Sequence, residues 1–186
     1  MTINKVALIT GSGTGVGAAS ALALAARGWP VVIHYARSEA EVRATQALCD
    51  AGAAQGAETL RLQGDVAHDA DCRALVAATA KRCGRIDALV NNAGVTSFAG
   101  AANWDTVDAE TFRHIVGVNA LGSFQMIRAA ALQLKAAAGS VVNVSSIAGA
   151  GHRLVDAARS MTGELLMLDG GMHLGAQGGT TIPGRG

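Results

Sequence analysis

Residues 5–17, KVALITGSGTGVG, decide the fold of this chain. The apolar run at 5–10 (KVALIT) has the length and composition of a strand buried on both faces. Glycines follow at once, and the Ala- and Leu-rich stretch at 18–27 favours a helix that Gly28 can end. A strand, a glycine-rich turn and a helix in this order present backbone N–H groups to which a pyrophosphate can bind.

The same alternation continues along the chain. Further strands are expected at 31–34, 60–62, 86–90 and 141–145, with helices at 39–50 and 69–83 and a longer helical stretch from Asp108 to Gly139. Asp69 and Asp108 are expected to cap their helices. Strands separated by helices imply right-handed crossovers. The predicted fold class is therefore α/β, a Rossmann-like doubly wound parallel sheet in three layers.

The regular alternation of strands and helices ends beyond Gly151. A short helix is expected at 152–160 and one strand at 164–168. Residues 174–186 contain five glycines and are expected to be a disordered tail. We therefore expect a single dinucleotide-binding domain over residues 1–173.

Composition and charge exclude several classes of function. The 186 residues carry 15 Lys and Arg against 14 Asp and Glu, a balance that argues against a nucleic-acid partner and for a small molecule. We find no run of 18 uncharged apolar residues and no signal-peptide pattern at the start, so no membrane span and a cytoplasmic location are expected. The three cysteines and five histidines are scattered, so we expect neither a disulfide framework nor a metal site.

Five motifs carry a family resemblance. They are TGSGTGVG at 10–17, DV at 65–66, NNAG at 91–94, NALG at 119–122 and VVNVSSIAG at 141–149. In this order they resemble the short-chain dehydrogenase/reductase family. The segment at 161–171 (MTGELLMLDGG) is similar to the family's last strand, and VVIHYARS at 31–38 looks most like its ketoacyl-reductase and pteridine-reductase branches.

The resemblance implies the cofactor-binding residues. The turn would hold the cofactor phosphates through Gly11, Gly13, Thr14, Gly15, Val16 and Gly17. Asp65 would accept a hydrogen bond from the adenine amino group, and the Val66 backbone would donate one. Asn92, Ala93 and Gly94 would line the adenosine ribose. The alternative for Asp65 is a turn residue that follows a strand.

The choice of cofactor depends on the end of the second strand. An acidic residue there would bind the ribose 2′-hydroxyl of NAD, whereas a cation favours the 2′-phosphate of NADP. The sequence has Arg37 and Ser38 at this point, so NADP(H) is favoured and NAD(H) is the alternative. Two observations count against NADP(H): Arg37 can equally be a solvated charge, and Thr14 stands where many NADP-dependent relatives have a second Arg.

The resemblance also implies hydride transfer between NADP(H) and a small carbonyl or alcohol. Ser146 matches the Ser that hydrogen-bonds the substrate oxygen, and Asn119 matches the Asn of the proton relay. Without the family, Ser146 would be a strand-end hydroxyl and Asn119 a mid-helix side chain bonded to backbone. The family's Tyr-x-x-x-Lys pair is absent: the chain's one tyrosine is Tyr35, which Glu39 follows four positions later.

The interval from Ser146 to Thr162 is 16 residues, too short for the sixth strand and flanking helices that relatives have there. Either the polypeptide carries an internal deletion, or the sequence lacks a segment near 151–153. Relatives use one of the missing helices to dimerise, so a homo-oligomer of this chain would be weakened.

Two function classes follow from these observations. The first is an oxidoreductase of short-chain dehydrogenase/reductase type that lacks the catalytic Tyr and Lys. The alternative is a catalytically inactive NADP(H)-binding module that acts as a sensor or interaction partner. A Rossmann-like methyltransferase is a poor third, because it does not explain the NNAG and VVNVSS segments.

Overall fold

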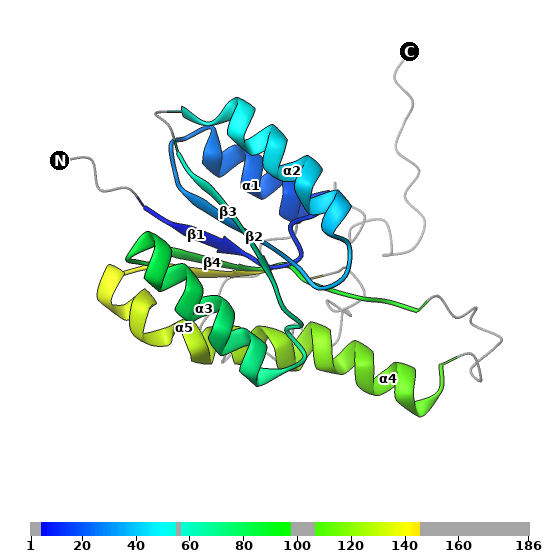
Figure 1. Ribbon diagram of the computed structural model, residues 1–186. Coiled ribbons are helices and arrows are strands. Elements are labelled where there is room, and N and C mark those ends of the chain that lie inside the picture. Colours follow the sequence, from blue (N-terminus) through cyan, green and yellow to red (C-terminus); the bar gives the residue numbers. More distant parts are fainter. Residues whose placement is uncertain (1–4, 55–56, 98–106, 146–186) are drawn as a thin grey trace, which may run out of the picture. The chain divides into compact units, whose positions relative to one another are not determined.

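A computed structural model describes residues 5–54, 57–97 and 107–145 (Figure 1). The strands are β1 (Ala7–Ile9), β2 (Val31–Tyr35), β3 (Thr59–Gln63), β4 (Ala88–Asn91) and β5 (Ser140–Asn143). The helices are α1 (Gly15–Ala25), α2 (Glu39–Gly52), α3 (Asp69–Cys83), α4 (Ala109–Val116) and α5 (Ser123–Ala137), and a π-helical turn, η3 (Gly117–Gly122), joins α4 to α5.

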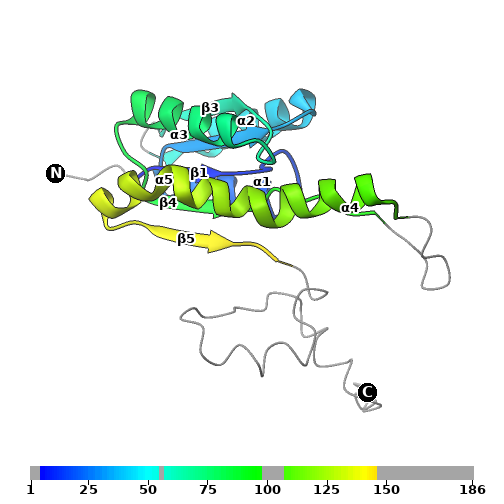
Figure 2. The ribbon, with the colours of Figure 1, turned by 90° about the horizontal axis from the view of Figure 1, so that it is seen from below.

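All five strands form one parallel sheet in the order β3-β2-β1-β4-β5. Helices α1 and α2 cover one face of the sheet, and α3 and α5 cover the other (Figures 1 and 2). The predicted three-layer, doubly wound α/β fold is confirmed. The strand order reverses direction between β1 and β4, and such a switch point opens a crevice at the carboxyl ends of the strands.

The side chains of β1 alternate between two hydrophobic clusters, one on each face. Ala7 and Ile9 pack with residues of α1 and α2, whereas Leu8 packs with residues of α3 and α5. All three side chains are fully buried. Burying a Leu or Ile side chain contributes about 1.5–3 kcal/mol, and burying the smaller Ala7 side chain contributes less. The apolar run that predicts a strand is therefore continuous because both faces of β1 are covered.

The two predicted caps have different outcomes. Asp108 caps α4, because its side chain accepts a hydrogen bond of 2.7 Å from the Thr111 amide. Asp69 does not cap α3: His68 is the N-cap, and the Asp69 carboxylate binds Arg73 and Arg128 instead. The arginine on α5 therefore ties that helix to α3.

Helices α4 and α5 run on through η3 as one 29-residue helix, Ala109–Ala137. Length and composition alone would allow this helix to cross a membrane, which is a weak indication because core helices also meet this test. Met126 and Ala130 of α5 are fully buried against the sheet. We therefore interpret α5 as part of the domain core, whereas α4 has no buried residue.

Contacts divide the chain into two units, residues 1–144 and residues 145–186. Several expectations lie outside the described residues: Ser146, the helix at 152–160, the strand at 164–168 and the glycine-rich tail at 174–186. Within the described part, β5 is an edge strand with Val141 and Val142 exposed.

Candidate cofactor site

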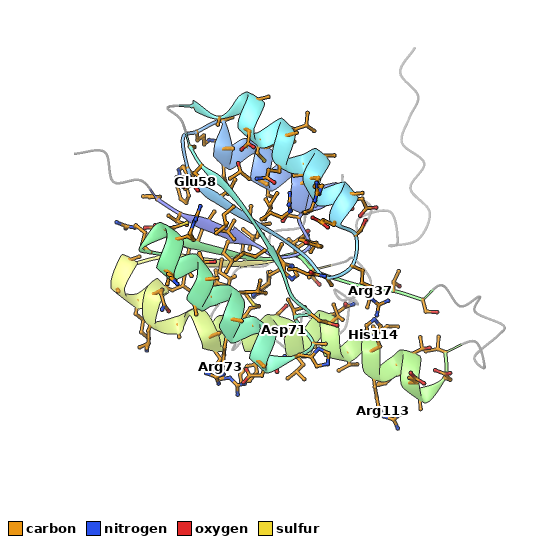
Figure 3. All side chains as sticks on the ribbon, viewed as in Figure 1. Arg37, Glu58, Asp71, Arg73, Arg113 and His114 are labelled. Carbon is orange, nitrogen blue, oxygen red and sulfur yellow. The ribbon has the colours of Figure 1, made fainter. Side chains whose placement is uncertain are left out.

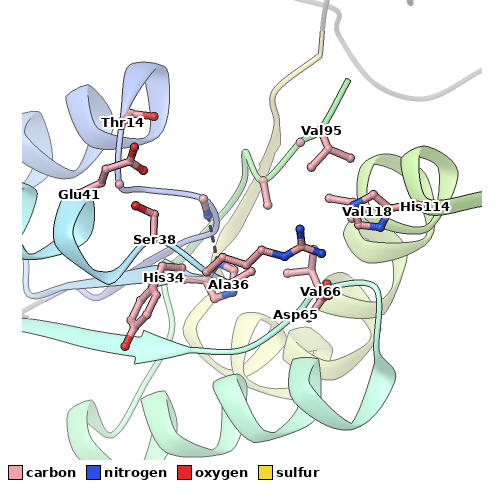
Figure 4. Close-up of a pocket in the computed structure, with 16 residues that line it drawn as sticks. Thr14, His34, Ala36, Ser38, Glu41, Asp65, Val66, Val95, His114 and Val118 are labelled. Carbon is pink, nitrogen blue, oxygen red and sulfur yellow. Dashed lines mark hydrogen bonds between the residues drawn. The ribbon is translucent and has the colours of Figure 1, made fainter. Parts of the chain in front are cut away.

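Four chain segments meet at the carboxyl ends of β1 to β4. They are the glycine-rich turn after β1, residues 36–38 after β2, residues 64–66 after β3 and residues 92–95 after β4. Members of all four segments line one cavity of about 320 Å³ (Figure 4). The parallel sheet brings these segments together although they are far apart in sequence.

Close approach and backbone conformation explain the glycines of the turn. Gly11 has φ +62°, and a Cβ there would lie 2.7 Å from the Ala93 Cα. Gly15 has φ +58°, a region that side chains disfavour. A Cβ on Gly17 would overlap the Asn92 side-chain nitrogen and lie 2.7 Å from the Gly11 carbonyl oxygen. The turn therefore exposes backbone next to the first turn of α1, which is a suitable cradle for a phosphate.

Side chains from the ends of β1 and β4 fix the turn. The Thr10 hydroxyl accepts hydrogen bonds from the amides of Asn92 and Ala93, at 2.9 and 3.0 Å. The Asn92 side chain donates to the carbonyl oxygens of Thr10 and Gly11. The predicted ribose-lining trio thus divides: Ala93 and Gly94 line the cavity, and the Asn92 amide supports the turn.

Of the predicted cofactor residues, nine line the cavity: Gly11, Gly13, Thr14, Arg37, Ser38, Asp65, Val66, Ala93 and Gly94. Gly15, Val16 and Gly17 belong to the first turn of α1 and do not line it. The sequence predictions missed other lining residues, among them His34, Glu41, Val95 and His114.

Asp65 is both a turn residue and a residue of the cavity wall, the two roles between which its sequence position alone did not decide. Its Oδ1 accepts a hydrogen bond of 2.9 Å from the Ala67 amide, as a turn residue does. Its backbone amide donates to Asp71 at 2.8 Å, and the residue also lines the cavity. The turn geometry therefore places this carboxylate at the cavity wall.

Arg37, which follows β2, and His114, on α4, both line the cavity, and their side chains are labelled in Figure 3. Arg37 is exposed and Ser38 is the N-cap residue of α2. Glu39 points its carboxylate to Arg43 and Arg61, at 2.8 and 3.4 Å. Glu41, in contrast, lines the cavity, and its Oε2 would lie 3.6 Å from a Cβ on Gly13. The cavity therefore carries a guanidinium and two carboxylates, Glu41 and Asp65.

His34 is a buried histidine within the apolar strand β2, with only 1% of its surface exposed. Its Nδ1 accepts a hydrogen bond of 3.0 Å from the Gly11 amide, drawn as a dashed line in Figure 4. Its Nε2 lies 2.9 Å from the Gly64 carbonyl oxygen. Burial lowers the pKa of His34 below 6.5, while the Gly64 bond and the charges of Asp65 and Asp71 oppose this shift. A polar residue inside the run VVIHY is the signal that could have identified it.

Asn119 lies in η3, and both of its side-chain hydrogen bonds go to one backbone residue. Its Oδ1 accepts from the Val95 amide at 2.8 Å, and its Nδ2 donates to the Val95 carbonyl oxygen at 2.9 Å. The π-helical turn around it is a feature common at functional sites. Asn119 thus ties the segment after β4 to the helix, and it does not line the cavity.

Comparison with known proteins agrees with this geometry. The family model described as short chain dehydrogenase matches residues 5–158. A 3-oxoacyl-[acyl-carrier-protein] reductase of Synechocystis is 37% identical over 150 residues, which cover 78% of this chain and 57% of the relative. L-fucose dehydrogenase of Bos taurus is 35% identical over 147 residues, or 78% of this chain and 50% of the relative. The match thus spans about half the length of these relatives.

A solved structure of a metagenomic short-chain oxidoreductase in complex with NADP has a TM-score of 0.71 and 33% identity. It covers 80% of this chain, and this chain covers 65% of it. A doubly wound sheet with a glycine-rich turn at its switch point defines a class, the dinucleotide-binding α/β proteins. Within that class, this chain belongs to the short-chain dehydrogenase family.

Proposed function

We propose that this chain binds a nicotinamide dinucleotide in the cavity at the ends of β1 to β4. The residues present fit such a ligand, because Gly11, Gly13 and Thr14 line the cavity with the turn that leads into α1. The turn and the first turn of α1, from Gly11 to Gly17, would hold the phosphates. Asp65 and Val66 would hold the adenine, and Ala93 and Gly94 the ribose, with Asn92 as their support.

NADP(H) is the preferred cofactor in this proposal, and the position of Arg37 at the cavity is the observation that supports this preference. Its guanidinium is exposed on the cavity, beside Ser38, where it can fork onto a phosphate. Glu39 is engaged by two arginines, which leaves Arg37 free of that carboxylate. Glu41 is the residue that opposes the preference, because it brings a negative charge to the same cavity. The solved NADP complex of a relative supports the same choice.

The reaction in this proposal is the reduction of a small carbonyl or the oxidation of a small alcohol. The nicotinamide, when bound, supplies or accepts the hydride. Ser146 would donate a hydrogen bond to the substrate oxygen, and Asn119 would hold the segment after β4 in place for the proton relay. The relatives' names point to ketoacyl and sugar substrates, and both classes contain a carbonyl or alcohol carbon. The proposal includes a cytoplasmic location and one domain over residues 1–173.

The second candidate is a nucleotide-binding module without catalysis. The observation that favours it is the position of Tyr35, the chain's one tyrosine, which lines the cavity at the proposed adenosine end and is far from Ser146 in sequence. Loss of a general acid typically slows a reaction by about 10²- to 10⁴-fold. Binding with negligible turnover is the signature of this candidate.

Two measurements on the 186-residue chain, its mass verified, test both candidates. Fluorescence titration with NADPH and NADH measures binding, and NADPH consumption with a panel of ketones and ketoacyl thioesters measures turnover. We expect saturable NADPH binding. Turnover above that of an Asn119→Ala and Ser146→Ala double variant supports the oxidoreductase. Binding without turnover supports the inactive module, and the absence of binding of either dinucleotide contradicts both.

A further inference from the structure

The imidazole of His34 joins two segments of the cavity that do not follow one another in sequence. One is the glycine-rich turn, through the Gly11 amide, and the other is the segment after β3, through the Gly64 carbonyl oxygen. Gly11 opens the turn proposed to hold the phosphates, and Gly64 directly precedes Asp65 at the proposed adenine end. Both hydrogen bonds come from one buried ring, so they fix these segments relative to each other.

The two partners also determine where the ring proton lies. The Gly64 carbonyl oxygen can only accept, so Nε2 must carry the proton. The Gly11 amide can only donate, so Nδ1 must be without a proton. A second proton on Nδ1 would set two N–H groups against each other inside a buried site. The geometry is therefore satisfied by one neutral tautomer and by no charged form.

The backbone of His34 is bound to the same turn. Its amide donates to the Ser12 hydroxyl at 2.8 Å, and its carbonyl oxygen accepts from the Ser12 amide at 3.1 Å. Release of the ring would therefore leave β2 in contact with the turn while it removes the bond at Gly11. The expected effect is local, at the start of the phosphate-binding turn.

We propose that His34 is a positioning residue for the dinucleotide: its neutral imidazole holds the phosphate-binding turn and the adenine-binding segment in register, and protonation releases the turn. The inference rests on the proposed function, since it assigns His34 to the cofactor site. If protonation of His34 releases the turn, the affinity for the cofactor falls as the pH is lowered. The charged groups that act on the ring are Asp65 after β3 and Asp71 on α3. Arg37 after β2, Glu41 on α2 and His114 on α4 line the same cavity.

Two amide variants separate the two hydrogen bonds. His34→Asn places an acceptor near the position of Nδ1, so it can still bind the Gly11 amide. His34→Gln places a donor near the position of Nε2, so it can still bind Gly64 and loses Gly11. Neither amide titrates. At about pH 8 we expect NADPH affinity within a few-fold of wild type for His34→Asn and about tenfold weaker for His34→Gln.

The pH profile provides the readout that a merely structural role would not change. Between about pH 8 and pH 5.5 we expect the wild-type affinity for NADPH to fall more than that of His34→Asn, and the excess fall should stay below about tenfold because burial lowers the pKa of His34 below 6.5. Titration of the 2′-phosphate affects both proteins equally and cancels in this comparison. Equal profiles in wild type and His34→Asn would overturn the inference.

Nitrogen NMR of the free chain separates this inference from the proposed function. We expect a His34 ring that is protonated at Nε2 and bare at Nδ1 at neutral pH, with slow hydrogen exchange at the Gly11 amide. A ring protonated at Nδ1, or a Gly11 amide that exchanges equally fast in wild type and His34→Gln, contradicts the positioning role even if NADPH binds. Failure of wild type to bind any dinucleotide, with the expected ring signature, contradicts the proposed function instead.

Discussion

The side-chain amide of Asn92 donates a hydrogen bond of 2.8 Å to the carbonyl oxygen of Gly11. The two residues are 81 positions apart in sequence, and the adjacency of β1 and β4 brings them together. The same nitrogen donates to the Thr10 carbonyl oxygen at 2.9 Å. One side chain after β4 therefore satisfies two backbone acceptors of the glycine-rich turn after β1.

Replacing this amide should destabilise the turn. Asn92→Ala leaves two partly buried carbonyl oxygens without their donor, at a cost of about 1–3 kcal/mol in the free energy of unfolding. We expect weaker dinucleotide binding as well, because the turn loses its support. Urea unfolding and NADPH titration measure the two effects. Gln63→Ala is the control: it removes an exposed hydrogen bond to Ala36 and should change stability by less than about 0.5 kcal/mol. Equal effects of both variants would contradict the role of Asn92.

Gly17 should tolerate no side chain. Gly17→Ala would push a Cβ into the Asn92 amide and the Gly11 carbonyl oxygen, so α1 must move away from β4. Overpacking of this kind costs about 1–3 kcal/mol, and we expect a loss of NADPH binding with it. Gly52→Ala at the end of α2 is the matched control, because its Cβ would meet nothing within 4 Å. That variant should be neutral or slightly stabilising in thermal unfolding. A Gly17→Ala variant as stable as Gly52→Ala would refute the close packing.

Periodicity predicts most of this fold because the sheet is buried on both faces. The apolar runs coincide with strands that helices cover, so strand positions agree with β1 to β5 to within a few residues. Asp69 shows where local pattern fails: an acidic residue at a helix start has the form of a cap, but Arg73 and Arg128 compete for its carboxylate. Arg128 is 59 residues away, and no local pattern contains that contact.

The candidate site likewise contains residues that local sequence predicts and residues that depend on tertiary packing. Motif residues with a backbone role, such as Gly11, can be predicted because their conformation requires glycine. Glu41 could not be assigned from the sequence, because its position at the cavity depends on how α2 lies beside the turn. His34 stands out in the sequence as a polar residue in an apolar strand, but its hydrogen-bond partners follow only from the way the turn and the end of β3 lie beside β2. The assignments of Ser146 and Asn119 stay predictions, and Ser146 lies outside the described residues.

Asp87 should make stability depend on pH below about pH 4. Burial raises the pKa of this carboxyl, but hydrogen bonds from Arg85 and the Val6 amide lower it more, so the pKa lies below 3.8. A carboxyl with a depressed folded pKa stabilises the protein above the pKa of the unfolded chain. That contribution is lost as pH falls through the folded pKa.

Asp87→Asn should therefore lose about 1–2 kcal/mol at neutral pH, and the difference from wild type should shrink as the solution is acidified toward about pH 2. Urea unfolding at several pH values measures this. Asp50→Asn, at an exposed position on α2, is the control and should leave the pH profile unchanged. A difference between wild type and Asp87→Asn that stays constant with pH would contradict the linkage.

Arg37→Asp should reverse the cofactor preference. The substitution removes the guanidinium proposed to bind the 2′-phosphate and sets a carboxylate beside the ribose, where it can accept from the 2′-hydroxyl of NAD. A charge-assisted hydrogen bond contributes about 1.5–3 kcal/mol, so NADPH affinity should fall about tenfold or more relative to NADH. Competitive titration with both dinucleotides gives the ratio. Arg82→Asp makes the same charge change on α3, at a residue that pairs with Glu58 and does not line the cavity, and should preserve the ratio. Glu41→Gln should shift the ratio further toward NADPH, because it removes a carboxylate from the cavity. An unchanged ratio in Arg37→Asp would show that another group selects the cofactor.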